Sequence, residues 1–375
     1  MYPIIMAGGA GTRLWPVSRK NKPKQIYPLI DKSTLLQKTW QRLRGGFKAK
    51  DIYLTTSRVI LQEIKQQLPE LEEKNVCLEP ARRDTAAALG LALLKIFKRD
   101  PNGVFVYVNA DNFVRDKKEF LRKLKTAGKV IKEKPEQTIL IGVNPSYPET
   151  GYGYIKIGKP ILKSKVNPPA GGQKSKVTRD EAFEVDEFKE KPDLATAKRY
   201  LSSWEYLWNP TLIVARVDQF LNFYKKYLPA TWQILAKISP AMDTAKEAVI
   251  LNKEFLKIKP ISVDYGILEP AARDKKLLVL PADFGWSDVG HWLAVKNILT
   301  GKKARNICKG AKCIALDSKD NLIYSMTGKL VALAGVSNMI VIETEDALLI
   351  CPKDRAQEVK KLVNELERRK LKEYL

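Results

Sequence analysis

A glycine-rich, basic stretch near the N-terminus contains residue types that bind phosphate groups. Residues 6–25 read MAGGAGTRLWPVSRKNKPKQ. Glycines let the backbone approach a ligand closely, and freed backbone N–H groups beside arginine and lysine suit a polyphosphate. The alternative is a surface loop with incidental charges. The candidate phosphate-binding residues are Gly8, Gly9, Gly11, Thr12, Arg13 and Lys24.

Two common phosphate-binding motifs do not fit this stretch. No lysine has the spacing of a GxxxxGK loop, and Leu14 interrupts a GxGxxG fingerprint at its last glycine position. Pro16, Pro23 and Pro28 exclude the helix that either motif requires next. We therefore expect an extended loop at the carboxyl end of a strand, the edge at which α/β sheets bind ligands.

The stretch resembles the signature of sugar-1-phosphate nucleotidyltransferases, GGxGTRLxPxTxxxPK. Its TRLWPVSR and PKQ segments are similar to the mannose-1-phosphate guanylyltransferase branch of that family. The resemblance implies that Arg13 and Lys24 neutralise the phosphates of the nucleotide as pyrophosphate leaves. It extends over nearly the whole chain and is weak in residues 160–182 and 230–258.

Two aspartates that are far apart in the sequence are candidate ligands of Mg2+, which prefers carboxylate oxygens. Asp111 follows the apolar segment GVFVYVNAD, and Asp288 lies in FGWSDVGHW. Similar segments of the family supply two metal-binding aspartates. Asn112 stands where relatives often have histidine, so the role of that neighbour is open. The alternatives are a capping aspartate at the first position and a tryptophan-rich core turn at the second.

A third segment, EPARRDTAAAL at residues 79–89, resembles the part of the family that binds the base. Guanine presents two donors side by side, and a carboxylate such as Glu79 is a suitable double acceptor. Asp84 and Thr85 complete the candidate nucleotide-binding set, and either is also a typical helix N-cap. Asp84 replaces an asparagine of the family motif.

Four further segments resemble the sugar-binding motifs of the family. Three of them have a structural alternative: a β-bulge, a solvated charge run and a buried capping aspartate. In the fourth, Pro210 and Thr211 replace Ser-Gly of the family motif, so the local backbone must differ. The candidate sugar-phosphate residues are Gly151 in PETGYGYI, Glu190 and Lys191 in FKEKPD, Asn209 in WNPT, and Asp264 in VDYGILE.

Composition narrows the class of protein. The formal charge of +24 is spread along the chain, which favours a lysine-rich solvated surface over a nucleic-acid partner. No stretch is long and apolar enough for a membrane span. The four cysteines form no CxxC pair, so we expect reduced thiols in a cytoplasmic protein. The single histidine, His291, makes a Ser-His-Asp mechanism improbable.

Strand and helix patterns alternate over the first 110 residues, which predicts an α/β fold. We expect a Rossmann-like, mostly parallel sheet with helices on both faces, in a catalytic domain of residues 1–298. Residues 299–375 alternate short apolar runs with turn residues and end in an amphipathic pattern. They predict a small β-rich, β-helix-like domain with a terminal helix. The segment at 163–176, KSKVNPPAGGQKSK, is expected to be a mobile loop.

The resemblance implies an enzyme that makes GDP-mannose and pyrophosphate from GTP and mannose 1-phosphate, with Mg2+ as cofactor. Direct attack on the α-phosphorus needs no covalent intermediate, so catalysis is positioning and charge neutralisation. The alternatives are the same chemistry with another nucleotide or sugar, and a non-catalytic regulatory paralogue that binds GDP-mannose. A homodimer is compatible with the C-terminal helix.

Overall fold

The computed structural model describes residues 1–9, 11–161, 181–301 and 303–375. The predicted loop at 163–176 lies outside these residues. The chain forms two compact units: Met1–Gly8, Trp40–Asn109 and Val114–Trp286 make the first, and Gly9–Thr39, Ala110–Phe113 and Ser287–Leu375 make the second. The predicted division into residues 1–298 and 299–375 stays a prediction.

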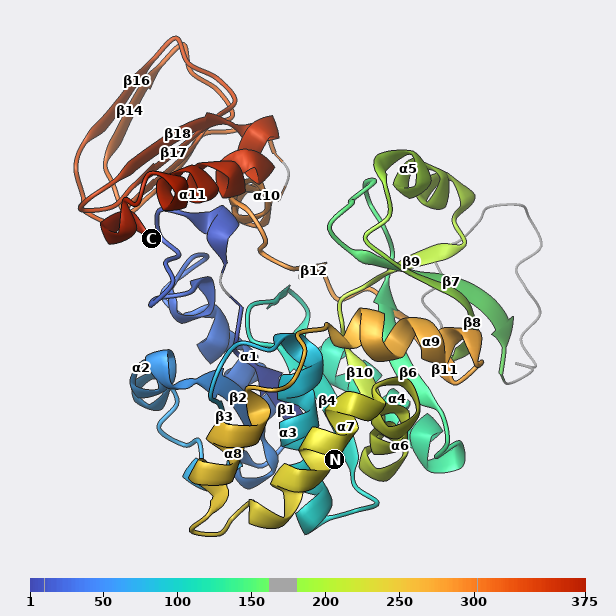
Figure 1. The fold of residues 1–375 in the computed structure, drawn as a ribbon. Helices are drawn as coiled ribbons and strands as arrows, with labels where there is room; N and C mark the ends of the chain where they lie inside the picture. Colours follow the sequence, from blue (N-terminus) through green and yellow to red (C-terminus); the bar gives the residue numbers. More distant parts are fainter. Residues whose placement is uncertain (10, 162–180, 302) are drawn as a thin grey trace, which may run out of the picture. The chain divides into compact units, whose positions relative to one another are not determined.

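The first unit is built on a ten-stranded sheet (Figure 1). Its parallel part has the order β4-β1-β2-β3. These strands are β1 (Tyr2–Met6), β2 (Tyr53–Ser57), β3 (Val76–Glu79) and β4 (Val104–Asn109). Met6 is the register partner of Asn109, and Ser57 is that of Glu79, so the carboxyl ends of the four strands meet at one edge. At this edge, Gly8 follows β1 and Glu79 is the last residue of β3.

The prediction of a mostly parallel sheet was wrong, because the rest of the sheet is largely antiparallel. β10 runs antiparallel to both β4 and β6, and β7 pairs antiparallel with β8 and β9. Among the described strands of this part, β6 and β11 form the one parallel pair. The further strands are β6 (Thr138–Val143), β7 (Gly153–Pro160), β8 (Phe183–Glu190), β9 (Tyr206–Asn209), β10 (Ile213–Arg216) and β11 (Leu277–Ala282).

Helices cover the sheet because its strands are apolar on both faces. Consecutive residues Ile4 and Ile5 of β1 are both fully buried. Ile4 and Phe105 pack in one core cluster with α3 and α6. The helices of this unit are α2 (Leu61–Gln67), α3 (Asp84–Arg99), α4 (Lys117–Glu133), α5 (Leu194–Ser203), α6 (Val217–Tyr227), α7 (Pro229–Ile238), α8 (Glu247–Phe255) and α9 (Glu269–Arg273). α1 (Leu35–Arg44) begins in the second unit, where Thr34 caps it through a hydrogen bond from Gln37 N.

The second unit contains parallel strands that repeat every 18 residues, as in the coils of a β-helix. Leu322 lies beside Ile340, and Cys313 lies beside Val331. Asn321 joins two coils, since its side chain donates to Val336 O and accepts from Met339 N, both at 2.8 Å. The parallel strands are β13 (Ile307–Lys309), β14 (Cys313–Leu316), β15 (Leu322–Ser325), β16 (Val331–Ala334) and β17 (Met339–Glu343). β18 (Leu348–Pro352) runs antiparallel to β17.

The helices of the second unit are α10 (Trp292–Thr300) and α11 (Val359–Arg368), drawn in orange and red in Figure 1. They confirm the predicted β-rich C-terminal region that ends in a helix. The short strands β5 (Phe113–Val114) and β12 (Trp286–Ser287) lie where the chain passes between the units. The core of the second unit includes Leu14 and Val17 from the N-terminal loop, together with Ile340 and Val359.

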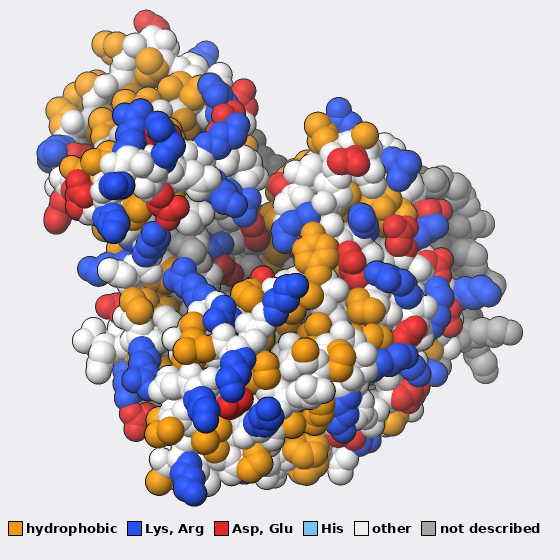
Figure 2. All heavy atoms as spheres, viewed as in Figure 1, with side chains coloured by type: hydrophobic (Ala, Val, Ile, Leu, Met, Phe, Trp, Pro, Cys, Tyr) orange, Lys and Arg blue, Asp and Glu red, His pale blue; other side chains and the backbone are white. Residues whose placement is uncertain are grey.

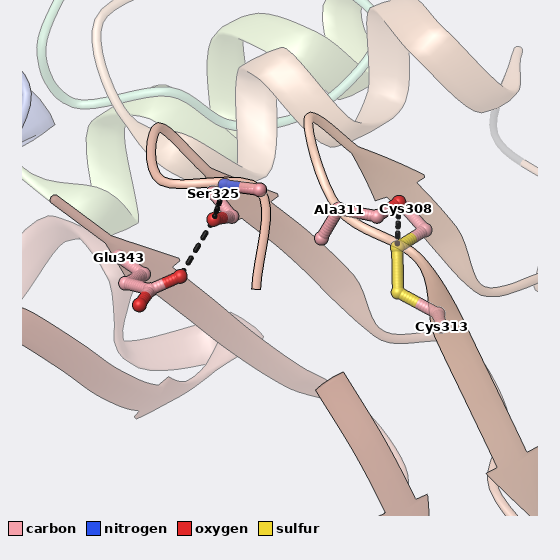
Figure 3. Close-up of a disulfide and its surroundings, with 6 residues drawn as sticks. Cys308, Ala311, Cys313, Ser325 and Glu343 are labelled. Carbon is pink, nitrogen blue, oxygen red and sulfur yellow. Dashed lines mark hydrogen bonds between the residues drawn. A yellow bond between two sulfur atoms is a disulfide. The ribbon is translucent and has the colours of Figure 1, made fainter. Parts of the chain in front are cut away.

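The expectation of four reduced cysteines was wrong for two of them. Cys308 and Cys313 form a disulfide across the turn between β13 and β14 (Figure 3). Gly310 lies in this turn with φ +76°, and a Cβ there would collide with Ser325 O. The turn brings together two cysteines that no CxxC pattern relates. Cys77 and Cys351 are free thiols.

Two surface properties bear on the expected partners. On the face shown in Figure 2, lysine and arginine side chains are scattered among acidic and hydrophobic ones, as a solvated surface predicts. Within the described ranges, no helix is long and apolar enough to cross a membrane.

Candidate functional site

The glycine-rich loop folds back on itself around Gly11. Gly11 has φ +61° and precedes a short 3-10 turn at Thr12–Leu14. A Cβ on Gly11 would lie 2.5 Å from Ser18 Oγ and 3.0 Å from Lys24 Cγ. Both the positive φ and the crowding require glycine here. The part of the loop that follows Gly11 is anchored because Leu14 and Val17 are buried in the core of the second unit, with 0% and 2% of their surface exposed.

Lys24 joins the two candidate metal-binding segments. Its side chain is nearly buried, and its Nζ lies 3.0 Å from Asp111 Oδ2. The same Nζ donates to Asp288 O at 2.9 Å and to Val289 O at 3.2 Å. A Cβ on Gly9 would lie 3.6 Å from Asp111 Oδ2, so the start of the loop also faces this carboxylate. The structure therefore brings Gly9, Lys24, Asp111 and the Asp288 segment together within the second unit.

A tight turn orients the side chain of Asp288. Its Oδ1 accepts a hydrogen bond from Gly290 N at 3.0 Å, and Ser287 Oγ accepts one from Val289 N at 3.3 Å. A Cβ on Gly290 would collide with the Asp288 carboxylate. Val289 is fully buried although its φ is +48°, a conformation that a β-branched residue rarely adopts. The packing of Val289 thus holds a strained turn that presents Asp288.

His291 belongs to this cluster, although no sequence motif marks it as a site residue. Burial lowers the pKa of His291 to about 4; Asp288 raises it, whereas Arg13 and Lys24 lower it further. The side chain is therefore neutral at pH 7. Its Nδ1 accepts a hydrogen bond from Ala294 N at 3.3 Å and caps α10. Its role as an N-cap could have been inferred from its position directly before an apolar helical pattern.

Arg13 and Thr12 lie on the 3-10 turn. The Arg13 side chain is partly exposed, and its Nη1 donates to Gln357 Oε1 at 2.7 Å. Thr12 O accepts a hydrogen bond from Trp15 N, which closes the turn.

The predicted base-binding residues lie in the first unit. Glu79 ends β3 and is 8% exposed, and a Cβ on Gly8 would lie 3.6 Å from its Oε1. Burial raises the pKa of Glu79 to about 7; Arg82 lowers it and Asp84 raises it. The Glu79 carboxyl group accepts no hydrogen bond from the described residues, so it keeps its capacity for a ligand.

Asp84 and Thr85 begin α3, but neither is a regular N-cap. Asp84 has φ +64°, and its Oδ1 accepts from Thr85 N at 2.7 Å. Thr85 Oγ1 accepts from Val263 N at 2.9 Å and so anchors the segment before Asp264. The expectation that one of the two caps the helix was wrong, because the Thr85 hydroxyl binds another chain segment and Asp84 lies inside the first turn.

Four of the predicted sugar-phosphate residues come together at the ends of β8 and β9. Asn209 Nδ2 donates to Asp264 Oδ1 at 2.8 Å, and Lys191 Nζ lies 2.7 Å from Glu190 Oε1. Glu190, Asn209 and Asp264 are each less than 8% exposed. A Cβ on Gly153 would lie 2.5 Å from Glu190 Oε2, so glycine at this position leaves room for that carboxylate.

Gly151 lies in the turn before β7, where its N–H donates to Glu149 Oε1 at 2.8 Å. Thr211 N donates to Asn209 Oδ1 at 3.0 Å, and Thr211 has φ +52°. Thr211 therefore adopts a conformation that favours glycine at the position where the family motif has one.

The buried carboxyl groups of this cluster resist ionisation. Burial raises the pKa of Asp264 to about 7; the charge of Glu190 raises it further, whereas Lys191 and the hydrogen bond from Asn209 lower it. Burial also raises the pKa of Glu190, against the effect of Lys191. Glu269, which is not among the residues predicted from the sequence, accepts a hydrogen bond from Glu190 N at 3.3 Å. The cluster thus contains carboxyl groups, an amide and one ammonium group that suit a polar ligand.

Comparisons with known proteins identify the class. A family model described as nucleotidyl transferase matches residues 2–301. A second, described as MannoseP isomerase/GMP-like beta-helix domain, matches residues 311–366. Fold and site together therefore define a nucleotidyltransferase with a C-terminal β-helix domain.

The chain is 35% identical over 372 residues to a mannose-1-phosphate guanylyltransferase of Escherichia coli K12, an alignment that covers 98% of this chain and 73% of that protein. It is 33% identical over 370 residues to the xanthan biosynthesis protein XanB of Xanthomonas campestris pv. campestris, with the same coverage. A crystal structure described as mannose-1-phosphate geranyltransferase from Thermus thermophilus matches with a TM-score of 0.83 and 28% identity, covering 98% of this chain and 99% of that one. The chain belongs to the mannose-1-phosphate guanylyltransferase family, which confirms the family and enzyme class predicted from the sequence.

Proposed function

We propose that this protein transfers the guanylyl group of GTP to mannose 1-phosphate, which yields GDP-mannose and pyrophosphate. A phosphate oxygen of the sugar attacks the α-phosphorus, and the bond to the β-phosphate breaks as pyrophosphate leaves. The observation that carries the proposal is the position of Lys24, whose ammonium group contacts both Asp111 and the Asp288 backbone. A cation between two carboxylate-bearing segments suits a reaction in which negative charge moves along a phosphate chain.

We assign the phosphate chemistry to residues of the second unit. Arg13 and Lys24 bind phosphate oxygens and stabilise the charge that develops on the leaving pyrophosphate. Backbone N–H groups around Gly9 and Gly11 add donors that need no side-chain reorganisation. Neutral His291 adds no competing positive charge, and its hydrogen bond to Ala294 N keeps α10 in place behind Asp288.

The aspartates suit Mg2+, which the family's chemistry implies. Asp111 already accepts a cation, the Lys24 ammonium group, at 3.0 Å. The described residues contain no group of three or more His, Cys, Asp or Glu side chains that could hold a metal ion by themselves. A pair of aspartates fits an ion that takes its remaining ligands from water and phosphate oxygens. Asp111 and Asp288 would hold the ion, which would neutralise charge on the α-phosphate and the sugar phosphate.

We assign recognition of base and sugar to the first unit. Glu79 accepts hydrogen bonds from the N1–H and N2–H groups of guanine, and Gly8, Asp84 and Thr85 shape the neighbouring backbone. A buried carboxyl group without a protein partner is costly, so a ligand with two adjacent donors gains most from it. Glu190, Asn209 and Asp264 bind sugar hydroxyls, Lys191 binds the sugar phosphate, and Gly151 lines the approach.

A regulatory paralogue that only binds GDP-mannose fits less well, because this chain keeps Arg13, Lys24, Asp111 and Asp288. A cytoplasmic location and a homodimer stay predictions.

The proposal is tested by identifying the product and the stereochemistry. We expect GDP-mannose, measured by mass, from GTP, mannose 1-phosphate and Mg2+. With a P-chiral α-thio analogue of GTP, a single in-line displacement inverts the configuration at phosphorus. Retention would exclude direct attack. Absence of any product from folded protein that binds GDP-mannose would support the regulatory alternative.

A further inference from the structure

The C-terminal segment contacts the phosphate-binding loop through several polar side chains. Residues 13–20 make polar contacts with residues 346–374, which follow β17 in the chain. These contacts are Arg13–Gln357 at 2.7 Å, Trp15 Nε1 to Tyr374 O at 2.8 Å, Arg19–Asp346 at 2.7 Å and Lys20–Glu367 at 2.8 Å. Leu14 and Val17 pack in the same core cluster as Ala356 and Val359. The conformation of the loop therefore depends on a segment more than 300 positions away.

One of these contacts reaches a proposed catalytic side chain. Gln357 is exposed, and its Oε1 accepts a hydrogen bond from Arg13 Nη1. The contact uses one of the five N–H donors of the guanidinium group and leaves the others for a ligand. Because the acceptor is a neutral amide, Arg13 keeps its full charge.

Without this contact, charge repulsion and rotamer entropy favour conformations in which the Arg13 side chain points away from Lys24 and His291. Arg13 and Lys24 both lower the pKa of His291, so the positive charge of each reaches this side chain. Like charges repel, and a partly exposed arginine side chain has many rotamers. An acceptor that fixes one rotamer reduces the entropy lost when phosphate binds.

We propose that Gln357 is a positioning residue, which orders Arg13 before GTP binds. This inference rests on the proposed function, because it concerns how Arg13 binds the nucleotide. It extends the proposed site to the β-helix domain, which thereby contributes to nucleotide affinity as well as to folding.

Two variants of Gln357 separate positioning from charge. In Gln357→Met the side chain keeps its length but loses the acceptor, and we expect the KM for GTP to rise about tenfold. In Gln357→Glu a carboxylate pairs with Arg13 and competes with phosphate, so the KM should rise further and the loss should shrink at high salt. The KM for mannose 1-phosphate should change little in both. Asn364→Leu, at an exposed polar position on α11, the helix that follows the 3-10 turn of Gln357, is the matched control and should behave as the wild type.

A double-variant cycle tests whether the effect acts through Arg13. In an Arg13→Lys background, Gln357→Met should have almost no further effect on GTP affinity. Equal losses with and without Arg13, or a KM for GTP unchanged in both Gln357 variants, would overturn the inference. Calorimetric titration with GTP keeps the two proposals distinguishable. If the wild type makes no GDP-mannose, the proposed function fails, whereas loss of GTP affinity in Gln357→Met still supports the contact.

Discussion

The ammonium nitrogen of Lys24 lies 3.0 Å from Asp111 Oδ2 and 2.9 Å from the backbone oxygen of Asp288. One side chain thus joins segments that are 177 positions apart in the sequence. The lysine is 8% exposed, and such a buried charge is stable only when it is paired and hydrogen-bonded. A phosphate ligand would meet a cation whose position is already fixed.

Replacing Lys24 should therefore remove activity and leave the fold intact. In Lys24→Met the apolar stem stays and the charge is lost, and we expect kcat to fall on the order of 10²-fold or more. Steady-state pyrophosphate release measures this, with circular dichroism to confirm folding. Lys22→Met, an exposed lysine of the same loop, is the control. Near-normal turnover by folded Lys24→Met would remove Lys24 from the mechanism.

Glu79 should make GTP binding depend on pH. Its pKa is raised to about 7, and only the ionised carboxylate accepts both guanine donors. The ionised fraction grows with pH, so kcat/KM for GTP should rise about tenfold between pH 6 and pH 8. The measured pH profile of the wild type should show this rise, and the profile of Glu79→Gln should lack it.

Inosine triphosphate provides a second test of Glu79, because hypoxanthine lacks the N2 amino group. The wild type should prefer GTP over inosine triphosphate by about tenfold or more, since the loss leaves a buried acceptor unpaired. Glu79→Gln should lose most of this preference. If both proteins prefer GTP over inosine triphosphate to the same degree, a residue other than Glu79 recognises the base.

Asp264 should lower the stability of the protein at high pH. Its pKa is raised to about 7 by burial and by Glu190, so its contribution to stability is complete below pH 4 and is lost as pH rises through 7. Asp264→Asn does not titrate and should exceed the wild type in unfolding free energy on the order of 2 kcal/mol at pH 8. Urea unfolding at pH 5 and pH 8 measures the difference.

The same variant should lose affinity for mannose 1-phosphate, because the buried pair of Asn209 and Asp264 is proposed to bind sugar hydroxyls. A stability gain that is equal at both pH values would contradict the assigned titration. An unchanged KM for mannose 1-phosphate would contradict the assigned contact.

The Cys308–Cys313 disulfide should stabilise the second unit. Closing so short a loop is worth about 2 kcal/mol in the chain-entropy description. Reduction, or Cys308→Ser, should therefore lower the melting temperature by about 4 to 8 °C in calorimetry. Cys77→Ser keeps the disulfide and serves as the comparison for thiol counting. Two titratable thiols in denatured, unreduced wild type are expected, and four would contradict the pairing.

The residues proposed to carry the chemistry were easier to predict from the sequence than the residues that hold them in position. Asp111 and Asp288 stand in recognisable motifs, so they could be selected although only folding joins them. Gln357 could not be selected, because its contact with Arg13 spans 344 positions and no motif marks it. His291 was visible only as a lone histidine, and its neutral state depends on burial.

The fold was predictable where strand and helix patterns alternate along the chain. The alternation of strand and helix indicated the strands β1 to β4 and their parallel direction. It did not indicate that β10 would pair antiparallel between β4 and β6, because strand direction depends on the path of the chain and not on apolar pattern. The disulfide likewise depends on a turn at Gly310.

The most direct test of the central claim is pyrophosphate release with Mg2+, in which four nucleoside triphosphates are each combined with mannose 1-phosphate and with glucose 1-phosphate. We predict release mainly from GTP with mannose 1-phosphate, and little from the other pairs. Preferential release from another pair, or no release from any pair by folded protein, would contradict guanylyl transfer to mannose 1-phosphate.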